Sequence, residues 1–147
     1  ADEPCTALDA GLQAQILELL AGLVAERGMG LLLISHDLAL MAQQVQRLMV
    51  MYAGQLVESG PTGAVLGRPA HPYTEGLLAA RPRLGLRGQR LPAMRGMVPG
   101  LAELAQSGGG CSFRPRCPRA QEQCRQDPTL QALADGQQAR CLRIGEP

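Results

Sequence analysis

Apolar side chains recur every three or four residues between Ala10 and Arg27, and glutamine and glutamate residues lie between them. This spacing predicts an amphipathic helix over residues 10–27. Asp9 is placed to cap the N-terminus of the helix, and Gly28 is placed to end it. We therefore expect the first ordered element of the chain to be a helix with a cap at each end.

The next apolar run, residues 31–34, is continuous and short. A run of this kind is typical of a fully buried strand in a parallel sheet that has helices on both faces. Ser35, His36 and Asp37 follow it, and then a second short helix over residues 38–44. Because ligands bind at the carboxyl ends of strands in open α/β sheets, His36 is predicted to stand at a binding position.

The pattern then changes to strands and short helices. Residues 47–52 and 55–58 are predicted to be two strands joined by a hairpin turn at Ala53 and Gly54. Residues 61–66 and 72–80 are predicted to be short helices, the second of which has a proline in its first turn. Residues 81–110 show no periodicity and are expected to form an irregular arm. The fold class is therefore α/β.

Composition limits what this chain can do. Its 147 residues make at most one ordinary domain, and all 14 basic residues are arginine. Without lysine the chain cannot contain the phosphate-binding pattern G-x-x-x-x-G-K-[ST], so it cannot form a complete ATP site alone. The 18 glycines and 11 prolines are concentrated after Gly60. The second part of the chain is therefore expected to need a source of order other than a large apolar core.

Charge and hydropathy exclude further classes. A net charge of +1, with 18% charged residues, predicts no nucleic-acid partner. No apolar run approaches the roughly 20 residues that a membrane-spanning helix needs. The chain starts with alanine, not methionine, and its first four residues do not form a signal peptide. We expect a fragment or a processed chain.

Several motifs, in order along the chain, resemble an ABC-type ATPase. Residues 1–9, ADEPCTALD, resemble the end of the Walker B strand and the D-loop, and residues 35–37, SHD, resemble the switch histidine. Residues 51–61, 71–74 and 111–118 are typical of the ATPases of oligopeptide/dipeptide and nickel importers. The resemblance covers essentially the whole chain.

The resemblance implies roles for four residues. Asp2 would bind Mg²⁺, mainly through water, and Glu3 would be the general base that orients the attacking water. His36 would hydrogen-bond the γ-phosphate of ATP, and Asp9 would reach the partner subunit. The sequence departs from the family at Cys5, where serine or threonine is usual, and we interpret Cys5 as a small buried substitute.

Two family motifs are missing from this sequence. These are the phosphate-binding loop and the LSGGQ signature, so the isolated chain is expected to have no ATPase activity. The SGGG run at residues 107–110 looks similar to the signature but follows Walker B. We interpret it as a flexible linker.

Four cysteines follow a C-x₅-C-x₆-C-x₁₆-C pattern, and they are Cys111, Cys117, Cys124 and Cys141. Four thiolates can hold Zn²⁺ or an iron–sulfur cluster, and unliganded thiols or disulfides are the remaining alternative. The wide spacing favours a cluster, and the family resemblance implies [4Fe–4S]. Nearby arginines would offset the negative charge of such a centre. They are Arg114, Arg116, Arg119 and Arg125.

Together these features predict the C-terminal part of a P-loop NTPase domain of the ABC ATPase class over residues 1–66. An irregular, cysteine-rich C-terminal extension is predicted over residues 67–147. The resemblance implies an ATP-binding and hydrolysing subunit of a di- or oligopeptide importer, with nickel as an alternative cargo. Its partners would be a second ABC ATPase subunit, identical or different, and transmembrane permease subunits.

An extracytoplasmic substrate-binding protein would act with that assembly indirectly. The subunit would be peripheral on the cytoplasmic face of the inner membrane. The competing interpretation is a non-catalytic regulatory or assembly module that a metal centre stabilises. The transported substrate is not encoded in these residues.

Overall fold

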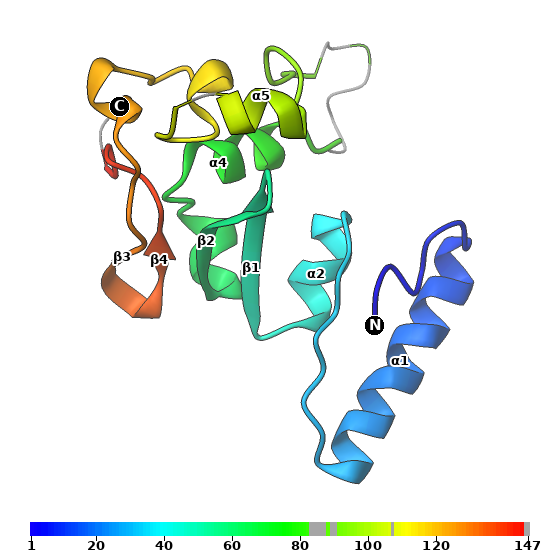
Figure 1. Cartoon of the computed structure of the whole chain (residues 1–147). Coiled ribbons are helices and arrows are strands. Elements are labelled where there is room, and N and C mark those ends of the chain that lie inside the picture. Colours follow the sequence, from blue (N-terminus) through cyan, green and yellow to red (C-terminus); the bar gives the residue numbers. More distant parts are fainter. Residues whose placement is uncertain (83–87, 89–90, 107, 146–147) are drawn as a thin grey trace. The chain divides into compact units, whose positions relative to one another are not determined.

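The computed structural model describes residues 1–82, 88, 91–106 and 108–145. It consists of two compact units, Ala1–Val45 and Gln46–Pro147 (Figure 1). The chain mixes helices with a small antiparallel sheet, so the predicted α/β class is confirmed at this level. Over the described ranges, no helix has both the length and the apolar character needed to span a membrane.

The first unit contains the two predicted helices, α1 (Ala10–Arg27) and α2 (Leu38–Gln44). Asp9 caps α1, because its Oδ1 accepts hydrogen bonds from the backbone N–H groups of Gly11 and Leu12 at 2.9 and 3.0 Å. Gly28 ends α1 with a φ of 61°, in the left-handed region that glycine adopts without steric cost. The prediction of α1 and both of its caps is confirmed.

The prediction of a fully buried strand over residues 31–34 is wrong. Only Ile34 makes a strand-like bridge, parallel to Asp2, and 68% of Leu32 and 52% of Ile34 are exposed. A strand of a parallel sheet is buried when neighbouring strands and covering helices lie around it. Among the described residues, the only bridge that this segment makes is the one to Asp2, so three of its four apolar side chains remain exposed.

The second unit is built on a sheet in the order β1-β2-β4-β3, in which every neighbouring pair is antiparallel. Its strands are β1 (Arg47–Tyr52), β2 (Gln55–Pro61), β3 (Gln131–Ala132) and β4 (Gln138–Ala139). Ala53 and Gly54 join β1 to β2 with φ values of 49° and 76°, as a tight hairpin turn requires. The predicted hairpin is confirmed, and β2 extends three residues beyond the predicted end.

Three short α-helices accompany the sheet: α3 (Thr62–Gly67), α4 (Pro72–Ala79) and α5 (Leu101–Gln106). The first two match the predicted helices to within a residue at each end, and α3 packs against β1 and β2. Helix α5 lies within residues 81–110, so the prediction of an irregular arm is wrong over Leu101–Gln106, and residues 83–87, 89–90 and 107 of the predicted arm lie outside the described residues. A helix of six residues is too short to show a periodic pattern.

The part of the chain that carries the C-terminal cysteines also contains three single-turn 3₁₀ helices. They are η1 (Arg114–Arg116), η2 (Glu122–Arg125) and η3 (Ala134–Gly136). These turns connect the cysteine positions without forming extended regular structure.

The three aromatic side chains Tyr52, Tyr73 and Phe113 form one cluster in the second unit. Their ring centroids lie 4.7 to 5.5 Å apart in tilted or edge-to-face arrangements. These are all the tyrosine and phenylalanine residues of the chain. The cluster joins β1, α4 and the segment that contains the cysteines.

The glycine run at residues 107–110 is only partly described, because Ser107 lies outside the described residues. Gly110 donates its N–H to Oδ1 of Asp127 at 2.6 Å. A Cβ atom on Gly110 would lie 2.7 Å from the carbonyl oxygen of Arg125. The interpretation of this run as a flexible linker is therefore wrong at Gly110, whose backbone is packed against η2.

Candidate functional site

Backbone hydrogen bonds bring the start of the chain alongside the segment that precedes His36. The N–H of Ile34 donates to the carbonyl of Ala1, and the N–H of Glu3 donates to the carbonyl of Ile34, both at 2.9 Å. This parallel pairing places Glu3 beside the residues that follow Ile34. The two motifs that resemble an ATPase are thus neighbours in space within the first unit.

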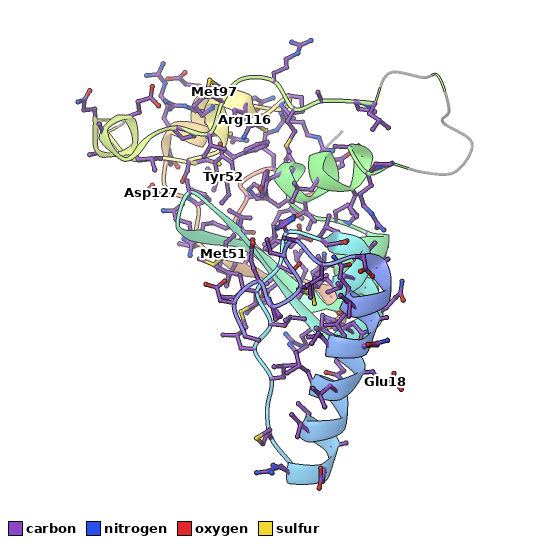
Figure 2. All side chains as sticks on the ribbon, turned by 90° about the vertical axis from the view of Figure 1, so that its right-hand side faces the viewer. Glu18, Met51, Tyr52, Met97, Arg116 and Asp127 are labelled. Atoms are coloured by element: carbon purple, nitrogen blue, oxygen red, sulfur yellow. The ribbon has the colours of Figure 1, made fainter. Side chains whose placement is uncertain are left out.

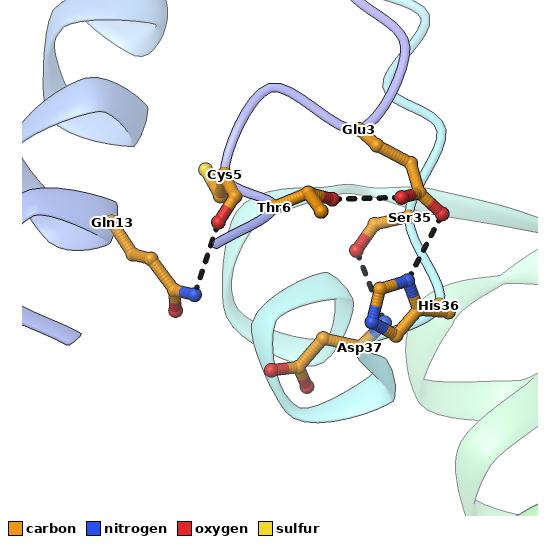
Figure 3. A network of polar contacts seen from close by, with 7 residues as sticks. All are labelled: Glu3, Cys5, Thr6, Gln13, Ser35, His36 and Asp37. Atoms are coloured by element: carbon orange, nitrogen blue, oxygen red, sulfur yellow. Dashed lines mark hydrogen bonds and ion pairs between the residues drawn. The ribbon is translucent and has the colours of Figure 1, made fainter. Parts of the chain in front are cut away.

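The side chains of Glu3 and His36 are in direct contact (Figure 3). Nδ1 of His36 lies 3.0 Å from Oε1 of Glu3, although 33 residues separate the two positions. The hydrogen bond with His36 is the main reason that the pKa of Glu3 is below its ordinary value, and the same bond raises the pKa of His36. Both side chains remain accessible, with 43% of Glu3 and 76% of His36 exposed.

A third side chain, that of Thr6, holds the same carboxylate. The Thr6 hydroxyl donates to Oε2 of Glu3 at 2.7 Å. A tight turn positions it, since the N–H of Thr6 donates to the carbonyl of Glu3 and Pro4 stands at the second turn position. Sequence analysis missed Thr6, although Pro4 was a signal for the turn.

The backbone of Glu3 is unusual. Its φ is 43°, in the left-handed region that residues other than glycine rarely adopt. Such conformations cost roughly 1–3 kcal/mol and occur preferentially at functional sites. The geometry of Glu3 is therefore consistent with a role in chemistry.

The two other acidic candidates lie in the same unit. Asp2 is exposed and is adjacent to Glu3 in the chain, and its backbone makes the bridge to Ile34. Asp9 uses Oδ1 to cap α1. Within one chain the carboxylate of Asp9 therefore has a structural task, in addition to the predicted contact with a partner subunit.

Cys5 is buried, as predicted, with 7% of its surface exposed. The amide of Gln13, on α1, donates to the carbonyl of Cys5 at 3.2 Å (Figure 3). It also donates to the carbonyl of Leu8 at 3.1 Å. These two bonds attach the loop that carries Thr6 to the first helix.

The four C-terminal cysteines line one pocket in the second unit, together with His71, Phe113 and three arginines. Its open volume is about 20 Å³, enough for about one water molecule. The cysteines are all free thiols. The fold thus gathers four thiols that are up to 30 residues apart in the sequence.

Three of these sulfur atoms accept a hydrogen bond from a backbone N–H two residues later. Arg143 donates to Sγ of Cys141 at 3.3 Å, and Phe113 and Arg119 donate in the same way to Cys111 and Cys117. Burial nevertheless raises the pKa of all three thiols. Without a bound cation these thiols are therefore neutral at pH 7, and metal binding would have to displace their protons.

The thiols are not arranged around a single ion. Within the described ranges, no three histidine, cysteine, aspartate or glutamate side chains are placed to coordinate one metal ion. The shared pocket and the N–H donors nevertheless suit thiolate ligands.

Two of the four arginines predicted to surround the thiols do not face them. Arg125 pairs with Glu122. Arg116 donates to the carbonyl of Arg95 at 2.9 Å and extends over the ring of Tyr52 (Figure 2). Arg125 thus has its partner within η2, and Arg116 has its partners on β1 and at Arg95.

The arginines that line the pocket are Arg114, Arg119 and Arg143. Arg119 pairs with Glu75 on α4, and Arg143 donates to the carbonyl of Arg119 at 2.7 Å. Arg143 was missed by sequence analysis because it follows the last cysteine. It lies near the other cysteines only in the folded chain.

Comparison with known proteins identifies related sequences. Residues 57–124 match the family model of the oligopeptide/dipeptide transporter C-terminal region. The dipeptide transport ATP-binding protein DppD of Escherichia coli K12 is 48% identical over 142 residues, which is 96% of this chain and 42% of DppD. A Brucella ovis protein, provisionally named a peptide import ATP-binding protein, is 49% identical over 153 residues, 99% of this chain and 44% of the relative.

The chain thus spans less than half the length of these relatives. The match to the family model and the identity along nearly the whole chain agree with the motifs at residues 1–9, 35–37 and 111–118. The chain belongs to the family of oligopeptide/dipeptide transporter ATP-binding proteins.

Proposed function

We propose that the full-length protein containing this chain binds and hydrolyses ATP to energise the import of di- or oligopeptides by an ABC transporter. The observation that carries the proposal is the 3.0 Å contact between Glu3 and His36. It joins the two motifs that would act on the terminal phosphate. The names of the relatives support peptides as the cargo, and nickel is the alternative.

Glu3 is suited to orient the attacking water. An ionised carboxylate offers about four acceptor positions, and His36 and Thr6 occupy one on each oxygen of Glu3. The remaining positions can accept a proton from water. Phosphoryl transfer asks mainly for positioning and charge stabilisation, so a carboxylate held from two sides meets the requirement.

His36 is suited to contact the phosphate. Its Nδ1 faces Glu3, which leaves Nε2 for a ligand. The raised pKa of His36 favours the imidazolium, in which both nitrogens donate hydrogen bonds. One ring can then hold the general base and a phosphate oxygen together.

Two further acidic residues complete the proposed site. Asp2, exposed beside Glu3, would hold Mg²⁺ mainly through water, and the ion would neutralise phosphate charge. Asp9 would contact a second ATPase subunit. We further propose that residues 1–66 belong to the ATPase domain and residues 67–147 to the extension.

The protein would act at the cytoplasmic face of the inner membrane as a peripheral subunit. Its partners would be a second ATPase subunit and membrane permease subunits, and an extracytoplasmic binding protein would deliver the cargo to them. These assignments rest on the family to which the chain belongs.

The test is ATP hydrolysis by the full-length protein. Glu3→Gln and His36→Ala should each lower kcat by about a hundredfold or more, whereas Glu18→Gln, on the exposed surface of α1, should not change it. The 147-residue chain alone should release no phosphate. Steady hydrolysis by Glu3→Gln would contradict the assignment of the general base.

We propose in addition that the four cysteines hold a [4Fe–4S] cluster, with Zn²⁺ as the alternative. The supporting observations are the shared pocket, the N–H donors to three sulfur atoms and the arginines that line it. A cluster binds each cysteine through a separate iron, so it does not require the four sulfur atoms to surround one ion. Its role would be structural, since it would cross-link a segment with little regular structure.

Anaerobic purification of the full-length protein tests this site. Iron and acid-labile sulfide should be present at about four atoms each per chain, and Cys141→Ser should lower both. Cys5→Ser is the matched control, because Cys5 lies in the other unit. Stoichiometric zinc without sulfide would contradict the cluster and support a zinc site instead.

The second candidate function is a non-catalytic regulatory or assembly module. The gathered thiols favour it, because a metal centre held by them would stabilise the second unit whether or not ATP is hydrolysed. A full-length protein that contains the metal centre and neither binds nor hydrolyses ATP would support this function over the first.

A further inference from the structure

We propose that Thr6 is a positioning residue for Glu3, which it holds through its side-chain hydroxyl during ATP hydrolysis. The inference rests on the proposed function, because it assigns a third residue to the same site. The contact that carries it is the 2.7 Å hydrogen bond from Oγ1 of Thr6 to Oε2 of Glu3 (Figure 3).

The two partners of the Glu3 carboxylate use different oxygen atoms. Thr6 donates to Oε2 and His36 lies against Oε1, so neither competes with the other. Two contacts on opposite oxygens fix the plane of the carboxylate, whereas one contact would leave it free to rotate. The bond from Thr6 holds Oε2 while His36 keeps Oε1 on its Nδ1 and presents Nε2 to a phosphate.

The position of Thr6 depends on local backbone structure. The turn from Glu3 to Thr6, closed by a 3.1 Å backbone hydrogen bond, brings the hydroxyl over the carboxylate. Gln13 holds the same loop by donating to the carbonyls of Cys5 and Leu8. The hydroxyl is thus presented by a loop that is itself attached to α1.

A hydrogen bond from a hydroxyl group to a charged carboxylate is stronger than a hydrogen bond between neutral groups. The hydrogen bond from Thr6 would orient Glu3, the proposed general base, without contact between Thr6 and the substrate. Loss of such a bond should therefore lower the rate of the chemical step and leave substrate binding nearly unchanged.

The matched variants are Thr6→Val, which removes the hydroxyl at nearly constant shape, and Thr6→Ser, which keeps it. In the full-length protein, Thr6→Val should lower kcat by about tenfold and change the KM for ATP by less than about twofold. Thr6→Ser should stay within about twofold of the unmodified protein. Thr129→Val, at an exposed threonine of the second unit, controls for the exchange itself.

A second measurement does not depend on hydrolysis. In the 147-residue chain at pH 7, the ¹³C shift of the Glu3 carboxyl carbon should move in Thr6→Val and stay in place in Thr6→Ser and Thr129→Val. An unmoved shift in Thr6→Val, or a Thr6→Ser protein as slow as Thr6→Val, would overturn the role of the hydroxyl. Absence of hydrolysis in the unmodified full-length protein would instead refute the proposed function, while the ¹³C shift still decides whether Thr6 holds Glu3.

Discussion

The side-chain amide of Gln137 donates a 2.6 Å hydrogen bond to Oε1 of Glu58, and 79 residues separate the two positions. Both residues are buried, Glu58 completely. The same carboxyl group accepts the backbone N–H groups of Ala70 and His71 at 2.8 and 3.0 Å. Glu58 therefore connects β2 to the segment before α4 and to the segment before β4.

Replacing Glu58 should strongly destabilise the second unit. Glu58→Leu leaves three N–H donors, two of them buried, without this acceptor, and we expect the free energy of unfolding to fall by about 3 kcal/mol or more. Asp135→Asn is the control, since Asp135 pairs with Arg68 at the exposed surface and such pairs contribute less than about 1 kcal/mol. Urea denaturation measures the free energy of unfolding of both variants. An equal decrease in the two variants would show that the buried hydrogen bonds of Glu58 contribute no more than an exposed ion pair.

Gly110 should tolerate no side chain. Gly110→Ala would place a methyl group within 2.9 Å of the carbonyl oxygens of Arg125 and Cys124, and we expect a loss of about 2–4 kcal/mol. Gly136→Ala shares the positive φ but meets no atom within 4 Å, so it should lose only about 1 kcal/mol. Thermal unfolding of the two variants separates the steric cost from the backbone cost, and similar losses would contradict the close packing at Gly110.

His71 should make the stability of the second unit depend on pH. Burial lowers the pKa of His71 from 6.5 to about 4 in the folded chain. As the pH falls below about 6.5 the unfolded state takes up the proton first, so stability is lost progressively down to about pH 4. The shift corresponds to about 3 kcal/mol at most.

The matched variant for this effect is His71→Asn. Nδ1 of His71 accepts the N–H of Tyr73 at the start of α4, and asparagine can replace that acceptor without titrating. The difference in unfolding free energy between the two proteins should shrink or reverse from pH 7.5 to pH 4.5. A difference that stays constant with pH would show that His71 does not titrate in this range.

Asp9 should contribute to the stability of α1 in the single chain. Asp9→Ala removes the acceptor for the N–H groups of Gly11 and Leu12 and should cost about 1 kcal/mol. Asp9→Asn retains a capping side chain and should cost much less. Unfolding followed by circular dichroism compares them, and equal stability of all three proteins would leave Asp9 with a role only between subunits.

The family resemblance predicted Glu3 and His36 as site residues from the sequence, and the structure brings their side chains into contact. The family resemblance did not point to Thr6. The hydroxyl of Thr6 reaches Glu3 only because the turn at Pro4 folds the chain back. Nor could the spacing of arginines show that Arg143 lines the cysteine pocket while Arg125 pairs elsewhere. An arginine side chain is long enough to reach several possible partners, and the fold determines which of these partners lie near it.

The sequence by itself determined the features that depend on residues a few positions apart. Helix α1 with its caps at Asp9 and Gly28, and the hairpin turn at Ala53 and Gly54, follow from hydrophobic spacing and from local backbone preferences. Only the tertiary structure decided which distant groups meet, as in the bond from Gln137 to Glu58 and in the exposure of Leu32. Such contacts require the closure of long loops and the burial of particular faces, and these depend on every neighbouring element at once.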